Sequence, residues 1–179
     1  CLIPLINKDL EKAIELATKI INSFEKKYEE KWLNMMRDKL GLFGADEKDK
    51  FLILDLLTWM HQKKVDYTNT FCHLMNENVH KNKDYEDKDF QNWKIRWNER
   101  LKIKNNTPEK CLKLMKTVNP LIIPRNHNVE KVLEEAEKNN LKPITELIAV
   151  LKDPYTKKDN IDDYQNPSNS DKNYKTFCG

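Results

Sequence analysis

The spacing of apolar residues constrains the fold most, because these residues recur every three or four positions along much of the chain. This spacing is typical of amphipathic helices. Only three glycines occur, against 34% charged residues, which disfavours the tight turns that sheets need. The sequence therefore predicts an all-α fold, a helical bundle-like domain. Residues from about 9 to 39 are expected to form one long or once-broken helix. It carries the apolar stripe Leu10, Ala13, Ile14, Ala17, Ile20, Ile21, Phe24, Tyr28, Met35 and Met36.

That stripe is interpreted as core, covered by the other helices of a bundle, in preference to a groove for a partner protein. Gly41 is expected to end the first helix by adopting a left-handed conformation. The segment of residues 77–88 is mostly charged or polar, and we interpret it as a solvated loop and a candidate hinge. Further helices are expected at about 47–63 after an Asp46 cap, 67–76 after Asp66, along Phe90, Trp93, Trp97 and Leu101, and at 108–118, 129–138 and 143–151.

A proline-rich junction interrupts the helical pattern at residues 119–127, which read NPLIIPRNH. Pro120 and Pro124 fix their own φ angles and push the preceding residues towards extended geometry, so we expect a short apolar strut between them. The guanidinium of Arg125, the amide of Asn126 and the imidazole of His127 follow directly. With Asn119, these residues form the junction motif, just before the helix expected at about Val129.

Beyond Pro154 the apolar periodicity ends, and Asn, Asp, Lys and Ser dominate up to Lys172. The expected organisation is therefore one helical domain over residues 1–155 and an extended tail over residues 156–179 that ends in Cys178-Gly179. We expect this tail to act as a flexible tether.

Charge and cysteine content narrow the functional classes. A net charge of +3 with interspersed signs argues against nucleic-acid binding, and no apolar run is long enough for a signal peptide or a membrane span. Four scattered cysteines favour a reducing, cytoplasmic setting. The four histidines show no metal-ligand spacing, and the glycines form no phosphate-binding loop, so no metal and no cofactor are expected in this chain. A start at Cys1 without an initiator Met suggests a fragment or a processed product.

Asn119 to Glu130, NPLIIPRNHNVE, resembles the C-terminal signature of the selenoprotein O family, NP..IPRNH..VE, and the ending Tyr174 to Gly179, YKTFCG, is similar to the family's ending. The resemblance covers nearly the whole chain. Further matching pieces occur in order: Leu2 to Ile6, Lys39 to Leu42, Asp66 to Thr68, Thr70-Phe71, Trp93, Trp97 and Asp153 to Tyr155.

The resemblance implies a longer parent protein, a protein adenylyltransferase whose kinase-like domain lies before Cys1 and uses ATP and magnesium to transfer AMP to protein hydroxyls. This chain would be its C-terminal helical domain, inactive alone, with that kinase-like domain and the protein substrates as partners. The competing interpretation is a non-enzymatic helical module that binds a partner protein.

Two candidate functional features follow. Arg125, Asn126 and His127 either bond a carboxylate or phosphate on the catalytic domain or, as we favour, satisfy backbone groups that the junction leaves unpaired. Cys178 is a redox candidate, because the resemblance implies a C-terminal cysteine that pairs with a residue of the catalytic domain; an idle terminal thiol is the alternative. Cys72, in apolar surroundings, is expected to be a buried and inert thiol.

Overall fold

The computed structural model describes residues 2–77, 82–103, 106–158 and 161–168. Within these ranges the chain forms helices and no strand, so the all-α prediction is confirmed. The elements are α1 (Ile3–Ile6), α2 (Leu10–Lys39), α3 (Asp49–Lys63), α4 (Tyr67–Leu74), the 3-10 helix η1 (Lys83–Glu86), α5 (Lys88–Leu101), α6 (Pro108–Val118), α7 (Asn126–Glu137), α8 (Lys142–Leu151) and α9 (Asp162–Gln165).

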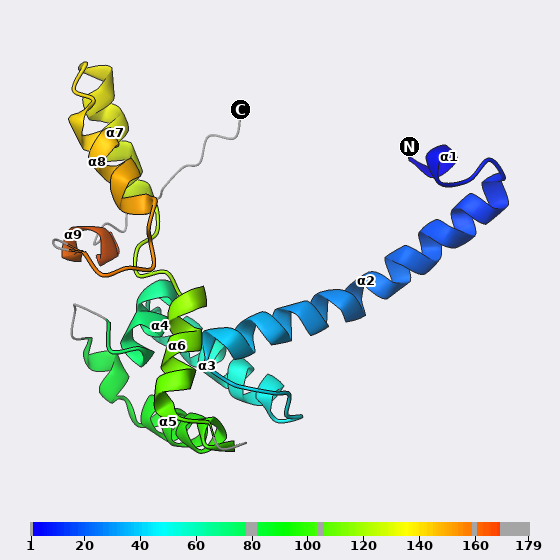
Figure 1. Ribbon diagram of the computed structural model, residues 1–179, viewed down its shortest axis with the longest axis horizontal. Helices are drawn as coiled ribbons and strands as arrows, with labels where there is room; N and C mark the ends of the chain where they lie inside the picture. The colour runs from blue at the N-terminus through cyan, green and yellow to red at the C-terminus, as the bar shows by residue number, and fades with distance from the viewer. Residues whose placement is uncertain (1, 78–81, 104–105, 159–160, 169–179) are drawn as a thin grey trace.

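A compact body and two projecting arms make up the molecule (Figure 1). The body consists of α3, α4, α5 and α6 together with the C-terminal end of α2 (Figure 1). One arm is the rest of α2, which runs away from the body and carries α1 at its tip; the other is the hairpin of α7 and α8 (Figure 1). The junction at residues 119–125 connects the body to the hairpin.

The core lies in the body, where the end of α2 meets α3, α4 and α5. Its fully buried side chains come from elements far apart in the sequence: Met36, Leu40, Ile53, Leu56, Phe71, Met75, Phe90 and Ile122. Trp93 and Trp97 are buried, and their indole N–H groups donate to the carbonyls of Leu52 at 2.8 Å and Leu40 at 2.9 Å. The two indoles therefore fill space and also satisfy buried backbone acceptors.

Gly41 ends α2 as predicted. Its φ of +69° is left-handed, and the next residue, Leu42, donates its N–H back to the Arg37 carbonyl at 2.9 Å. A Cβ at this position would lie 2.9 Å from the Cys111 carbonyl oxygen, so glycine also allows α6 to approach closely.

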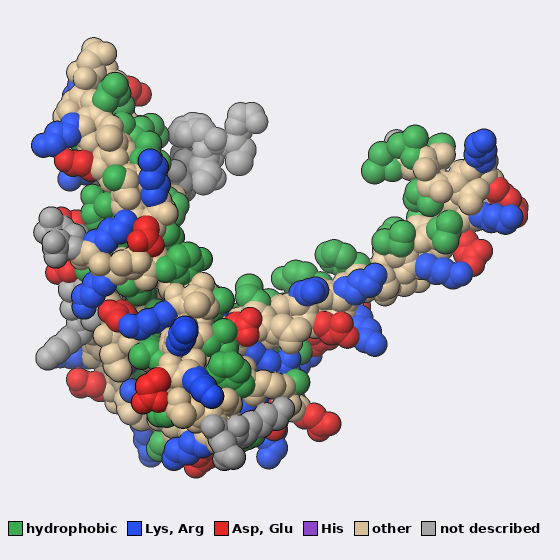
Figure 2. All heavy atoms as spheres, in the orientation of Figure 1, with side chains coloured by type: hydrophobic (Ala, Val, Ile, Leu, Met, Phe, Trp, Pro, Cys, Tyr) green, Lys and Arg blue, Asp and Glu red, His purple; other side chains and the backbone are tan. Residues whose placement is uncertain are grey.

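The prediction that the α2 stripe is buried in a bundle is wrong for most of its length. Only Ala13 and Met36 of the stripe are buried; exposed members include Leu10, Ile14, Ile20, Ile21, Phe24, Tyr28 and Met35. Figure 2 shows hydrophobic side chains along the edge of this arm that faces the other arm, and charged side chains along the opposite edge. The physical reason is that the body reaches only the last turns of α2, where Trp32 and Leu33 pack against the core.

The expectation of an extended tether beyond Pro154 is wrong for residues 161–165. Ile161 is 4% exposed and joins the core, and Gln165 in α9 is 1% exposed. The apolar pattern misses this docking because α9 is held largely by polar contacts. Residues 169–179, which include Cys178, lie outside the described residues.

Smaller corrections concern helix starts and the loop at residues 77–88. The side chain of Asp46 does not cap α3, because it accepts the N–H of Lys48 at 2.8 Å and α3 begins only at Asp49. In the loop, η1 buries Tyr85, whose hydroxyl lies 3.2 Å from the Thr70 hydroxyl. By contrast, Asp66 caps α4 as predicted, by accepting the Asn69 N–H at 2.8 Å.

Candidate functional site

The junction is a rigid strut, as its prolines predict. Leu121 and Ile122 are buried, and their N–H groups both donate to the Pro154 carbonyl, at 2.8 Å and 3.3 Å. Asn119 is extended with φ −109° and ψ 105°, and its side-chain amide donates to the carbonyls of Lys39 and Met115, each at 2.9 Å. The junction therefore ties α6 to the end of α2 and to the segment after α8.

Arg125 is the centre of the polar contacts. Its Nη1 donates to Asp66 Oδ2 at 2.8 Å and its Nη2 donates to Asp66 Oδ1 at 3.0 Å, a bidentate ion pair whose side chains are 9% and 23% exposed. The same guanidinium donates to Asn69 Oδ1 at 3.2 Å and to the Tyr164 carbonyl at 3.3 Å. All these acceptors belong to the described part of this chain, but none of them is a backbone group of the junction, so the favoured interpretation does not describe Arg125.

The electrostatics of Asp66 follow from this pairing. Burial alone would raise the pKa of the Asp66 carboxyl, but the hydrogen bonds from Arg125 and from the N–H groups of Asn69 and Thr68 outweigh burial and hold the pKa below its ordinary value. The carboxylate thus stays charged, and it both caps α4 and anchors the junction. Such a group is poorly placed to act as a general base.

The hydrogen bonds around Arg125 and Asp66 extend to two residues that the sequence analysis did not identify, Asn69 and Gln165. Asn69 is 7% exposed, and its Nδ2 donates to the Gln165 carbonyl at 3.0 Å. The Nε2 of Gln165 donates in turn to the Glu77 carbonyl at 3.3 Å. No sequence signal links them, because Asn69 and Gln165 are 96 positions apart and α9 lies in a polar segment.

Asn126 and His127 do not join Arg125. The α7 helix begins at Asn126 and not at about Val129 as predicted, so Arg125 is the N-cap residue and the next two residues form the first turn. Asn126 is exposed and His127 is half-buried. Asn126 and His127 therefore belong to the first turn of α7, whereas the Arg125 side chain bonds to Asp66 and Asn69 of the body.

Cys72 is buried beside these polar contacts, and its Sγ lies 4.0 Å from the Nε2 of Gln165 in α9. Burial is the main reason that its thiol pKa rises, to about 12. A thiol in this environment is not a nucleophile at neutral pH. The expectation of a buried Cys72 is confirmed, and its inertness stays a prediction. The redox candidate Cys178 lies outside the described residues.

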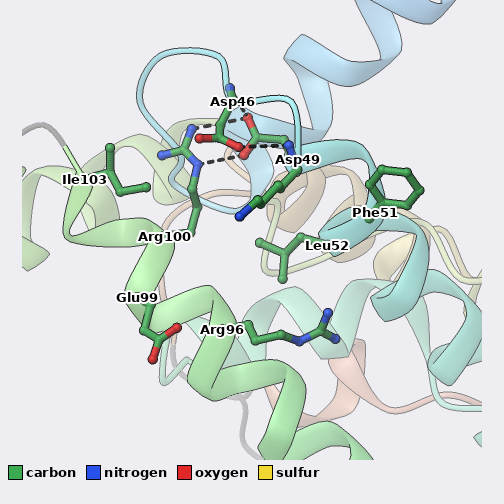
Figure 3. A pocket seen from close by; sticks show the side chains of 9 residues that line it. Asp46, Asp49, Phe51, Leu52, Arg96, Glu99, Arg100 and Ile103 are labelled. Atoms are coloured by element: carbon green, nitrogen blue, oxygen red, sulfur yellow. Dashed lines mark hydrogen bonds and ion pairs between the residues drawn. The ribbon is translucent and has the colours of Figure 1, made fainter.

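A hollow of about 440 Å³ lies between α3 and α5 (Figure 3). Asp49 is fully buried at its edge and accepts hydrogen bonds from Arg37 Nε at 2.6 Å and Arg100 Nε at 2.7 Å. Arg100 also donates to the carbonyls of Phe43 and Gly44, so its donors are used inside the chain. This cluster fixes the turn between α2 and α3, because two guanidinium groups bind one buried carboxylate.

Within the described ranges, no group of three or more His, Cys, Asp or Glu side chains lies close enough to hold a metal ion. None of the helices described is both long and apolar enough to cross a membrane.

A family model described as protein adenylyltransferase SelO matches residues 1–152. Three curated relatives are called protein nucleotidyltransferase YdiU. The protein from Pelagibacter ubique is 48% identical over 100% of this chain, and those from Nitrosococcus oceani and Clostridium perfringens are 39% and 41% identical over 99% of it. The aligned stretch makes up only 37%, 36% and 36% of these relatives, so the chain spans little more than a third of their length.

Proposed function

The chain belongs to the protein adenylyltransferase SelO family, and on that premise we propose that it is the C-terminal helical domain of a protein adenylyltransferase. In this proposal the chain supports a kinase-like catalytic domain located elsewhere in the full-length polypeptide. The catalytic domain binds ATP and magnesium, and its substrates are hydroxyl groups of proteins.

The reaction that we propose for the full-length protein is transfer of AMP. A protein hydroxyl attacks the α-phosphorus of ATP, a new oxygen–phosphorus bond forms, and the bond between the α- and β-phosphates breaks. The hydroxyl proton leaves to a base, and pyrophosphate is the leaving group. Magnesium would neutralise charge on the phosphates in such a site.

The observation that carries the supporting role is the uncovered apolar face of α2. Ile21, Phe24 and Tyr28 are 70%, 67% and 62% exposed. The rings of Phe24 and Tyr28 stack on each other, with their centroids 6.0 Å apart. Burial of one large apolar side chain stabilises a protein by about 1.5–3 kcal/mol. A surface of this kind indicates that the folded unit is completed by another body, and most of the relatives' length lies outside the aligned stretch.

This supporting role differs from that of a non-enzymatic interaction module, which the same exposed face also suits. The two proposals differ in what the full-length protein does with ATP. We favour the enzyme because a family model described as protein adenylyltransferase SelO matches residues 1–152 of this chain.

The experiment uses the full-length protein with magnesium and ATP labelled either in the α- or in the γ-phosphate. Under our proposal, protein becomes labelled from α-labelled ATP and not from γ-labelled ATP, and residues 1–179 alone incorporate neither label. If the full-length protein incorporated no α-label, the adenylyltransferase proposal would be wrong. Equal incorporation by residues 1–179 alone would overturn the assignment of catalysis to another domain.

We also propose a regulatory role for Cys178, which rests on the family resemblance alone. A low-molecular-weight disulfide, such as oxidised glutathione, would accept two electrons and two protons as Cys178 and a cysteine of the catalytic domain join in a disulfide. Thioredoxin-type dithiols would reverse the reaction. Activity of the full-length protein should then depend on redox poise and lose that dependence in Cys178→Ser.

A further inference from the structure

The exposed face of α2 has a regular register. Most of its apolar positions alternate at spacings of four and three residues, which place them on one line along the helix. Leu16 and Ile20, which are 42% and 63% exposed, lie to one side of this line. We call this line the α2 seam, and it consists of Leu10, Ile14, Ala17, Ile21, Phe24, Tyr28 and Met35. Lys31 takes the position between the last two, so the continuous part of the seam ends at Tyr28.

The register of the seam indicates the kind of surface that covers it. Apolar residues that repeat on average every 3.5 residues are the signature of two helices packed with knobs in holes. A helix packed on a sheet or on a broad body has a wider apolar face with a period of 3.6. The continuous part runs from Leu10 to Tyr28, about 27 Å at 1.5 Å per residue, so the covering helix needs about five turns.

The residues that flank the seam favour a particular partner charge. In heptad terms the positions on one edge are Glu11, Thr18 and Glu25, and those on the other edge include Ile20 and Lys27. These edges form ion pairs between helices in a coiled coil. The covering helix should therefore carry a basic residue opposite Glu25.

A second copy of this chain fits these edges poorly. An antiparallel pair of α2 helices would bring the edge with Glu11 and Glu25 against itself, which places like charges together. A parallel pair would set Lys27 against Trp32 and Ile20 against Glu25, so neither arrangement forms an ion pair across the seam. Two α2 seams from two copies of the chain could therefore bury their apolar residues against each other, but the charged residues on their edges would not be complementary.

The rest of the polypeptide is the better source of the covering helix. Nearly two thirds of the length of the curated relatives lies outside the stretch aligned with this chain. A helix from that part is tethered to the arm, so it binds at a high effective concentration without a separate association step.

We propose that the α2 seam is the seat of one amphipathic helix of the same polypeptide, from outside residues 1–179, packed along Leu10 to Tyr28 in the manner of a two-stranded coiled coil. This proposal rests on the proposed function, because it names the surface by which the helical domain supports the remainder of the protein.

The test is site-specific photo-crosslinking in the full-length protein, with p-benzoylphenylalanine placed at Ile14 or Phe24 and at Lys26 as the control. Lys26 is exposed on the opposite face of the same helix. Mass spectrometry of proteolytic peptides maps the residue captured. We expect the probes at Ile14 and Phe24 to capture, within one molecule, two residues of a single helical stretch outside residues 1–179. The probe at Lys26 should not form this crosslink.

Several outcomes would overturn the proposal: a covalent dimer joined through α2, crosslinks only within residues 1–179, or capture at Phe24 no different from that at Lys26. The α-labelled ATP assay on the unsubstituted full-length protein separates this failure from failure of the proposed function. If the protein transfers AMP but forms none of the expected crosslinks, only the proposal that a helix packs on the α2 seam is contradicted. Correct crosslinks in a protein that transfers no AMP contradict only the enzyme assignment.

Discussion

The Arg125 guanidinium holds both carboxylate oxygens of Asp66, at 2.8 Å and 3.0 Å, across 59 positions of sequence. Asp66 caps the first turn of α4, and Arg125 is the residue before α7. One ion pair thus fixes the direction in which the α7–α8 arm leaves the body. The proline junction supplies the stiffness, and this pair supplies the anchor.

Replacement of Arg125 by Ala should destabilise the fold by about 1–3 kcal/mol, because the Asp66 carboxylate keeps its burial and loses its charged partner. Arg125→Lys should recover little, since an ammonium group cannot bind both oxygens in a fork. The exposed pair of Arg96 and Asp55, with side chains 52% and 50% exposed, is the control, and Arg96→Ala should cost less than about 1 kcal/mol. Urea midpoints of the three variants measure these differences; an unchanged midpoint for Arg125→Ala would contradict the anchor.

Acid should unfold the body through its paired carboxylates. Burial alone would raise the pKa values of Asp49 and Asp66, but hydrogen bonds from arginines outweigh it and lower both below the ordinary 3.8. A group with a lowered folded-state pKa stabilises the fold above its unfolded pKa, and this contribution is lost as the pH falls through the folded value.

The free energy of unfolding should therefore decrease as the pH drops below about 4. The slope of this decrease against pH should be shallower in Asp49→Asn and in Asp66→Asn than in the unsubstituted protein. Denaturant titrations at a series of pH values measure this slope. An identical slope in the two variants would show that these carboxyls titrate alike in the folded and unfolded states.

Two substitutions at left-handed positions should act in opposite directions. Gly41→Ala combines a φ of +69° with a Cβ that would lie 2.9 Å from the Cys111 carbonyl oxygen, so it should destabilise by more than about 1 kcal/mol. Lys64, the residue at the C-terminal cap of α3, has a left-handed φ of 54° although it carries a Cβ. Lys64→Gly should stabilise by about 0.5–1 kcal/mol, since glycine adopts this conformation without strain. Thermal unfolding compares the two, and a stabilising Gly41→Ala would contradict the close approach of α6.

Cys72 should not react with a thiol reagent in the native protein at about pH 8, because its burial leaves almost no thiolate. The raised pKa of about 12 supplies the chemical reason, and an exposure of 0% supplies the steric one. Labelling followed by peptide mass spectrometry should find Cys72 modified only after denaturation. For Cys178, in the tail outside the described residues, we predict modification before Cys72; the reverse order would contradict both statements.

The sequence predicts where a helix begins and ends better than it predicts what packs against that helix. The α2 helix was expected at about residues 9–39 and spans Leu10–Lys39, because periodicity and a terminal glycine are local signals. The same periodicity identifies the apolar face but not what covers it, so burial of Ile21 and Phe24 was predicted wrongly. An amphipathic stripe has the same pattern whether its partner lies in this chain or elsewhere.

The junction shows the same limit at the level of single residues. Two prolines predict a strut with a direct physical mechanism, and Leu121 and Ile122 form it. The partner of Arg125 was not predictable, since any Asp or Glu side chain satisfies the rule that a buried guanidinium needs a carboxylate. Docking of α9 through Gln165 also escaped prediction, because hydrogen bonds between distant polar residues leave no periodic trace.

Hydrogen exchange along α2 in the full-length protein tests the central claim most directly. An isolated helical arm frays, because helices gain most of their stability from packing. Our account predicts slow amide exchange over residues 11–28 in the full-length protein. Slow exchange should be lost when Ile21→Asp and Phe24→Asp are combined on the seam, and kept when Asn22→Asp and Lys26→Asp are combined on the opposite face. Fast exchange over residues 11–28 in the unsubstituted full-length protein, or equal exchange in the two double variants, would contradict the claim that the α2 seam supports the rest of the polypeptide.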